Sequence, residues 1–191
     1  ERHETAADFT YDQLILATGA RERFLPFPGW TLPNVMGVGA IQAMVKGGLP
    51  VRGKRIVIAG SGPLLLAVAA TLQSAGAIVV CIAEQASLAS LAPFALSLIT
   101  DPTKVLQGLR YKAATIDVPF HTGNWPLEAR GTDRVTSVVL SLHGRTEEIR
   151  CDYLACAFHL VSITELPALL GCRIEHGGGT QAVVIVDELQ R

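Results

Sequence analysis

Residues 54–84 read KRIVIAGSGPLLLAVAATLQSAGAIVVCIAE, and this stretch decides the fold. Residues 55–59 form a short, β-branched apolar run that predicts a buried parallel strand, and Gly60-Ser61-Gly62-Pro63 then breaks it. Residues 64–74 are rich in Leu and Ala and directly follow a proline, which predicts a helix. Residues 77–83 predict a second buried strand. The stretch therefore predicts a β-α-β unit with a parallel sheet.

The start of the predicted helix has the properties of an anion site. Its free N–H groups point at whatever lies beyond the first strand, and the helix dipole favours a negative charge there. We expect the diphosphate of a dinucleotide to lie on Gly60, Ser61, Gly62, Pro63 and Leu64, held through the backbone N–H groups of this turn.

Glu84 ends the second strand, 24 residues after Gly60, close to the spacing at which an acid binds an adenosine ribose. The same carboxylate would repel a 2′-phosphate by about 4 kcal/mol at about 4 Å and an effective dielectric near 20. We therefore expect NAD rather than NADP as the cofactor. One position departs from the GxGxxG pattern, because Leu65 stands where the third glycine would be.

Two other interpretations of this stretch were weighed. Residues 56–83 contain no charged side chain, which is a property of membrane-spanning helices. However, three glycines and a proline cut this run into pieces that are too short to cross a bilayer as one helix. The stretch could also be an ordinary sheet core without a ligand, and Leu65 keeps that alternative open. A Leu65 side chain lying against Ser61 or Gly62 would leave no room for a diphosphate.

Composition narrows the class of protein. The chain has 191 residues, 49% apolar and 17% charged, with a net charge of −1 and no Lys/Arg cluster, which predicts a globular protein that does not bind nucleic acid. Four cysteines include no CxxC pair, and Cys81 and Cys156 fall in apolar strands, so we expect reduced, buried thiols and a cytoplasmic location. The first residue is Glu1, without an apolar signal core after it, which favours a start inside a longer gene product.

The remaining elements follow from turn residues and periodicity. Before the central stretch we expect a strand at 11–17, an irregular linker at 21–34 and a short helix at 37–48. After it we expect a weakly charged segment at 85–100, a helix at 101–114 with Asp101 as its N-cap, a strand at 116–121 and a loop or irregular strand at 122–131. A β-hairpin follows, in which 134–142 pairs with 147–150 around the turn His143-Gly144-Arg145. The last expected elements are a strand at 152–158, a helix at 164–170 and a strand at 182–186.

Three stretches together resemble a known family: ILATGARERFLPFPGW at 15–30, GKRIVIAGSGPLLLAVAATLQSAGA at 53–77 and CDYLACAFHLVSITELPALLGC at 151–172. They look like the middle of a flavoprotein of the pyridine nucleotide-disulfide oxidoreductase superfamily. Within it the chain is most similar to the FAD/NAD-binding subunits of opine oxidase, hydrogen cyanide synthase and heterotetrameric proline/sarcosine-type dehydrogenases. The resemblance implies an α/β fold, with a Rossmann-like three-layer domain of parallel sheet, flanking helices and a β-hairpin or meander.

The resemblance also implies a domain plan. In that family an NAD domain is inserted between two separated segments of an FAD domain, so residues 37–165 would be the NAD-type Rossmann-like domain. Residues 1–36 would be a partial FAD-domain strand with a linker, and residues 166–191 a return segment toward the other FAD-domain half. We thus expect an excised middle piece, inactive alone, whose partners are the missing FAD-domain halves and a second oxidoreductase subunit.

Some residues depart from the family pattern. A Gly-Phe-Gly-Leu-Val-Pro-Asn-Thr-like run of the relatives is AFHLVSIT at 157–164 here, without its two glycines and its proline. Cys151 and Cys156 would lie about 16 Å apart along an extended strand, which argues against dithiol chemistry. His159 follows the end of a strand, where α/β sites gather, but a lone histidine there is more often structural than catalytic.

Our leading hypothesis is an FAD-dependent, NAD-binding oxidoreductase subunit that acts on an amine or amino-acid donor, with no catalytic residue or metal ligand assigned in this chain. The alternative is a non-catalytic domain that holds an adenine nucleotide, or none, and mediates subunit contacts.

Overall fold

The computed structural model describes residues 7–92, 102–142, 144–177 and 182–189. The chain divides into two compact units, one of Glu22–Leu160 and one of Glu1–Arg21 with Val161–Arg191. Within the described residues, no helix is both long enough and apolar enough to span a membrane.

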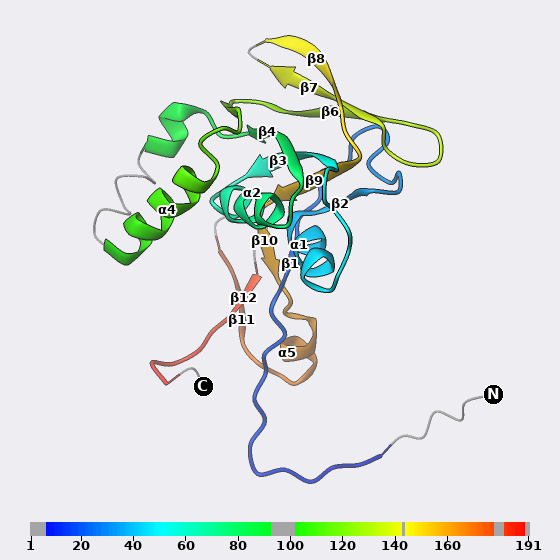
Figure 1. Ribbon diagram of the computed structural model, residues 1–191. Helices are drawn as coiled ribbons and strands as arrows, with labels where there is room; N and C mark the ends of the chain where they lie inside the picture. Colours follow the sequence, from blue (N-terminus) through cyan, green and yellow to red (C-terminus); the bar gives the residue numbers. More distant parts are fainter. Residues whose placement is uncertain (1–6, 93–101, 143, 178–181, 190–191) are drawn as a thin grey trace, which may run out of the picture. The chain divides into compact units, whose positions relative to one another are not determined.

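The larger unit is built on a five-stranded parallel sheet in the order β2-β9-β3-β4-β5 (Figure 1). Its strands are β2 (Val35–Gly37), β3 (Arg55–Ser61), β4 (Ile78–Glu84), β5 (Phe120–Thr122) and β9 (Tyr153–Phe158). In chain order, β3, β4, β5 and β9 are the first to fourth strands of the series, and across the sheet they lie in the order 3-2-1-4. This is the arrangement of a Rossmann-type sheet. The strand order reverses between β3 and β9, so the crevice beyond their carboxyl ends is the position where such sheets bind ligands.

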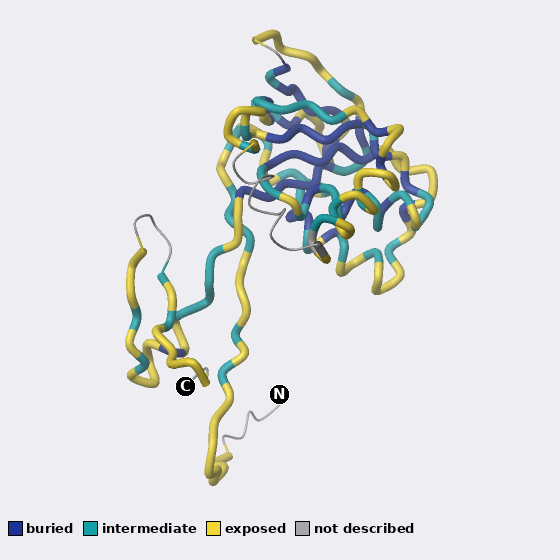
Figure 2. Tube along the Cα trace, turned by 90° about the vertical axis from the view of Figure 1, so that its left-hand side faces the viewer, coloured by how far each residue is buried: buried dark blue, intermediate teal, exposed yellow. Residues whose placement is uncertain are grey.

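Helices cover one face of the sheet and antiparallel strands the other, which gives three layers (Figure 1). Helix α1 (Val38–Lys46) and helix α2 (Leu64–Ser74) pack their buried side chains on one face. The second face is covered by a meander of β6 (Trp125–Arg130), β7 (Ser137–Leu142) and β8 (Arg145–Arg150). Figure 2 shows the buried residues concentrated in the strands of this unit. This confirms the predicted three-layer α/β fold.

Coverage of both faces explains the sequence of the central strands. A strand buried on both sides has no polar face, so it becomes a continuous apolar run. In β3 the side chains of Ile56 and Ile58 pack against the helices, whereas Val57 and Ala59 pack against the meander. The absence of charge in this part of the chain is therefore a property of a sheet core that is covered on both faces.

Several predicted elements are confirmed. Helix α2 has the predicted bounds, α1 lies within 37–48, and α4 (Pro102–Ala114) begins at the predicted proline. The hairpin is β7–β8, while the predicted turn residue His143, the N-cap Asp101 and positions 93–100 lie outside the described residues.

Other predictions were wrong. Residues 11–17 form no strand, because no described segment pairs with them and Leu14 and Ile15 are exposed. Strand β5 begins at Phe120 rather than at 116, because it forms where β4 is its hydrogen-bonding neighbour. The segment 122–131, predicted as a loop or an irregular strand, contains β6, whose register with β7 shifts between Pro126 and Glu128, so the irregular strand is confirmed. Strand β3 also continues through Ser61 into the predicted turn.

The smaller unit contains α5 (Glu165–Leu169) and an antiparallel pair, β11 (Ile174–His176) with β12 (Ala182–Val184). Strand β1 (Ala20–Glu22) pairs with β10 (Leu160–Ser162), and the division between the two units falls within both of these strands. In the smaller unit the Thr18 hydroxyl donates to the carbonyl oxygen of Ile163 at 2.8 Å, which ties its two chain segments together.

Candidate functional site

The glycine turn lies at the carboxyl end of β3, at the reversal of strand order. Gly60 has φ +148°, and a Cβ there would lie 1.8 Å from the carbonyl oxygen of Ala157 on β9. Only glycine allows the two strands to be neighbours at this level. Gly62 has φ +110°, and nothing lies within 4 Å of the position of its missing Cβ. Gly60 therefore serves strand packing, and Gly62 leaves open space beside the turn.

Helix α2 begins directly after this turn. Pro63 is its N-cap, with φ −65°, and no side chain caps the helix from that position. Leu64 is the first helical residue, so its N–H group has no intrahelical acceptor, whereas the N–H of Leu65 donates to the carbonyl oxygen of Gly62 at 3.2 Å. The turn thus presents backbone donors and the positive end of a helix dipole toward the crevice.

Glu84 lies at the end of β4, level with Gly60 on the adjacent strand. It is 2% exposed, and its Oε2 accepts a hydrogen bond from the N–H of Gly62 at 2.9 Å. Its Oε1 accepts one from the N–H of Ala86, also at 2.9 Å. The sequence places this acid at the turn but does not predict that it binds one of the turn's own N–H groups. A carboxylate has about four acceptor positions, so both oxygens can still accept hydrogen bonds from hydroxyl groups.

Leu65 does not plug the turn. Its side chain is fully buried in the core between α2 and the sheet, packed with Val68, Ala69 and Leu72 of the same helix. The condition under which a diphosphate would be excluded is therefore not met. The third glycine is replaced by a side chain that helps to hold the helix on the sheet.

The second small-residue turn follows β9. Ala157 and Phe158 are buried, and the Ala157 carbonyl occupies the space that a side chain at Gly60 would need. His159 is exposed and has φ +72°, a left-handed conformation that glycine adopts without strain. The strand register thus brings His159 and Gly62 to the same carboxyl edge of the sheet.

The cysteines are unsuited to dithiol chemistry. All four are free, and burial raises the pKa of the Cys81 and Cys151 thiols to about 12. Burial also raises the pKa of Cys156. Protonated thiols are poor nucleophiles, which agrees with a structural role. No group of three or more His, Cys, Asp or Glu side chains in the described part of the chain could hold a metal ion.

A second glycine turn was missed by the sequence reasoning. Gly37-Val38-Gly39 follows β2 and opens α1, and the N–H of Gly39 donates to Oε1 of Glu22 at 2.7 Å. The GxG spacing after a strand was the available signal. Here a carboxylate from a distant part of the chain serves as the helix cap.

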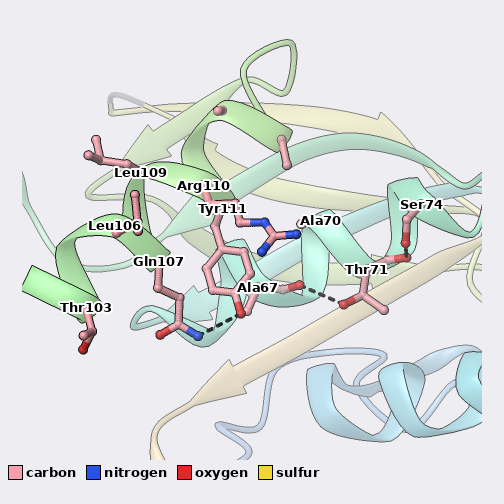
Figure 3. A pocket seen from close by; sticks show the side chains of 12 residues that line it. Ala67, Ala70, Thr71, Ser74, Thr103, Leu106, Gln107, Leu109, Arg110 and Tyr111 are labelled. Atoms are coloured by element: carbon pink, nitrogen blue, oxygen red, sulfur yellow. Dashed lines mark hydrogen bonds between the residues drawn. The ribbon is translucent and has the colours of Figure 1, made fainter.

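A hollow on the surface lies elsewhere, between α2 and α4 (Figure 3). It measures about 1050 Å³, and its polar side chains include Thr71, Gln107 and Tyr111. Gln107 donates to the Tyr111 hydroxyl at 3.2 Å, so these groups are engaged with each other. No residue of the glycine turn lines this hollow, and it adds nothing to the site.

Comparison with known proteins identifies the family. A family model described as "Pyridine nucleotide-disulphide oxidoreductase" matches residues 1–189. Hydrogen cyanide synthase subunit HcnB of Pseudomonas aeruginosa is 34% identical over 184 residues, which cover 91% of this chain and 39% of that protein. An opine oxidase subunit of Rhizobium meliloti is 31% identical over 187 residues, 87% of this chain and 38% of that protein. The chain thus spans about two fifths of the length of these curated relatives.

Solved structures agree with the fold. The ferredoxin reductase for the CYP199A2 system from Rhodopseudomonas palustris has a TM-score of 0.58 at 29% identity, covering 93% of this chain and 40% of that one. T. acidophilum thioredoxin reductase has a TM-score of 0.64 at 17% identity, covering 91% and 51%, a likeness of fold alone. From the family match over nearly all of its length and its relatives above 30% identity, this chain belongs to the pyridine nucleotide-disulphide oxidoreductase family.

Proposed function

We propose that this chain is the nicotinamide-dinucleotide-binding part of an FAD-linked oxidoreductase subunit. The observation that carries the proposal is the turn at the carboxyl end of β3. There Gly62 has open space beside it, the N–H of Leu64 at the start of α2 has no intrahelical acceptor, and the carboxylate of Glu84 binds the turn from the adjacent strand. An open crevice with donors for an anion and acceptors for hydroxyl groups fits a ribose joined to a diphosphate.

Different residues of the site bind different parts of the cofactor. The N–H of Leu64 and the positive end of the helix dipole hold the diphosphate, which lies along the backbone of Ser61 and Gly62, and the fixed φ of Pro63 sets the direction of the helix start. The free acceptor positions of Glu84 bind the adenosine ribose hydroxyls. Because this carboxylate is buried and would face a 2′-phosphate, the site prefers NAD to NADP. The bound dinucleotide supplies hydride chemistry, and the protein supplies binding and orientation.

The whole protein acts on an amine or amino-acid donor and passes electrons through FAD. This part of the proposal rests on the relatives, which belong to a hydrogen cyanide synthase and to an opine oxidase. Both relatives are named as subunits, which supports a second oxidoreductase subunit in the role of partner. Buried, free thiols support a reducing compartment, the cytoplasm.

The end segments belong with an FAD-binding part of the same protein. Residues 1–36 and 166–191 flank the NAD-type domain, residues 37–165, in this plan. Phe9, Ile15 and Leu169 are 84%, 88% and 84% exposed, so these segments present apolar side chains that a further domain would cover.

A second candidate function is a non-catalytic domain that holds an adenine nucleotide, or none, and mediates subunit contacts. Two observations favour it. Leu65 fills the place of the third glycine, and both oxygens of Glu84 already accept backbone hydrogen bonds. Under this alternative the turn is a structural feature whose donors are partly satisfied by the protein.

The complete protein with its flavin separates the two functions. Rapid bleaching of the flavin absorbance by NADH supports the oxidoreductase, whereas flavin that is reduced only by an amino-acid donor supports the non-catalytic domain. Calorimetric titration of ADP into this chain tests the nucleotide site itself. A folded chain that does not bind ADP would remove the cofactor assignment.

A further inference from the structure

His159 stands out in the crevice by its backbone conformation. It is the first residue beyond β9, and its φ of +72° lies in the left-handed region that side-chain-bearing residues rarely adopt. Among the described residues other than glycine, only Asn34 shares a positive φ. A strained residue that persists in a structure is a reason to ask what it does, because glycine would hold this conformation without cost.

Two hydrogen bonds to one residue hold His159 in place. The N–H of Phe158 donates to the carbonyl oxygen of Arg23 at 3.2 Å, and the N–H of Arg23 donates to the carbonyl oxygen of His159 at 2.9 Å. The backbone is thereby fixed on both sides of the His159 Cα. Its conformation is determined by the surrounding chain rather than by its own preference.

The sheet register places His159 beside the glycine turn. Ser61 on β3 and Phe158 on β9 are partners in adjacent parallel strands, about 4.8 Å apart. Gly62 and His159 are the next residues along each chain segment, so both stand at the carboxyl edge where the strand order reverses. On the other side of β3, Glu84 is the partner of Gly60. An anion on the turn therefore lies between the Glu84 strand and the His159 strand.

We propose that His159 is a further cofactor-binding residue, whose imidazole N–H donates a hydrogen bond to the diphosphate held at Gly62. The inference rests on the proposed dinucleotide site. An imidazole always carries at least one N–H donor, and phosphate oxygens accept it. His159 is exposed, so its imidazole is accessible at this edge of the sheet. In this arrangement Glu84 binds hydroxyl groups of the ligand on one side of the turn, and His159 binds its phosphate oxygens on the other.

Two substitutions test this without disturbing the backbone. His159→Gly removes the imidazole at a position where glycine is unstrained, and His159→Asn removes it but keeps a polar side chain that tolerates the left-handed region. His176→Asn, on the exposed strand β11 of the other unit, is the matched control. The affinities of ADP, inorganic pyrophosphate and adenosine for the 191-residue chain are measured by calorimetry, and thermal unfolding checks each fold.

We expect both His159 variants to bind ADP and pyrophosphate about tenfold more weakly, the loss of one charge-assisted hydrogen bond, with adenosine binding unchanged. His159→Gly should be at least as thermally stable as the wild type, and His176→Asn should bind all three ligands as the wild type does. Unchanged or tighter pyrophosphate binding by His159→Gly would overturn the inference and leave the dinucleotide site intact. A wild-type chain that binds neither ADP nor pyrophosphate would overturn the site, and the role of His159 with it.

Discussion

The two glycines of the turn should respond very differently to the same added methyl group. At Gly60 the new carbon would lie 1.8 Å from the carbonyl oxygen and 2.6 Å from the carbonyl carbon of Ala157. Both atoms belong to the backbone of β9, so the methyl group fits only if β3 and β9 move apart. Overpacking costs about 1–3 kcal/mol and a glycine-only backbone conformation about 1–3 kcal/mol more. We expect Gly60→Ala to lower the free energy of unfolding by roughly 2–6 kcal/mol.

Gly62→Ala is the matched control, because nothing lies within 4 Å of its added carbon and only the φ of +110° opposes the change. Its cost should be about 1–2 kcal/mol, so the chain stays folded. Its methyl group would enter the open space of the proposed diphosphate site, and we expect about tenfold weaker ADP binding. Urea unfolding followed by circular dichroism measures the stabilities, and calorimetry measures the affinity. Equal losses of stability in the two variants would refute this account of the turn.

Four further predictions concern Glu84, Leu65 and the cysteines. Glu84→Ala removes the acceptor of two backbone N–H groups and should cost about 2–4 kcal/mol in urea unfolding, more than Glu84→Gln, which keeps one acceptor oxygen. An Ala variant as stable as the wild type would show that these bonds contribute nothing. Leu65→Gly restores the GxGxxG pattern but removes a fully buried side chain. It should lower the free energy of unfolding by on the order of 3–5 kcal/mol without improving ADP affinity. A variant that is as stable as the wild type and binds ADP more tightly would contradict this. Burial raises the pKa of Cys81 and Cys151 from 9.0 to about 12. Their contribution to the free energy of unfolding is therefore present below pH 9 and is lost as the pH rises toward 12. Urea unfolding midpoints measured across that pH range check this. In native alkylation at pH 8 the half-buried Cys172 should react first, and rapid labelling of Cys81 would be the opposing result.

The part of the fold that local patterns determine could be predicted. The bounds of α2 follow from a proline at its start and a glycine after its end, and the hairpin β7–β8 follows from two short segments on either side of a glycine-containing turn. The central strands were predictable because a sheet covered on both faces requires uninterrupted apolar runs. The glycine turn and the acid at the end of β4 were found by spacing alone, and the structure places them on adjacent strands.

What could not be predicted depends on partners far away in the sequence. An extended segment becomes a strand only with a hydrogen-bonding neighbour, so the strand predicted at 11–17 does not form, and the sequence of 122–131 did not distinguish a loop from the irregular strand β6. The bond between Glu84 and the N–H of Gly62 arises from the parallel pairing of β3 and β4, which brings the strand end to the turn. The cap that Glu22 provides to α1 likewise spans two separate segments, and no local pattern signals it.

The central claim is that the carboxylate of Glu84 selects a dinucleotide bound at the Gly62 turn. Parallel calorimetric titrations of NADH and NADPH into the wild-type chain and Glu84→Gln test it most directly. The account predicts that the wild type binds NADH and rejects NADPH, since a buried carboxylate about 4 Å from a 2′-phosphate costs on the order of 4 kcal/mol, and that the neutral Gln variant narrows this difference. Equal or tighter binding of NADPH by the wild type, or the same preference in Glu84→Gln, would contradict it.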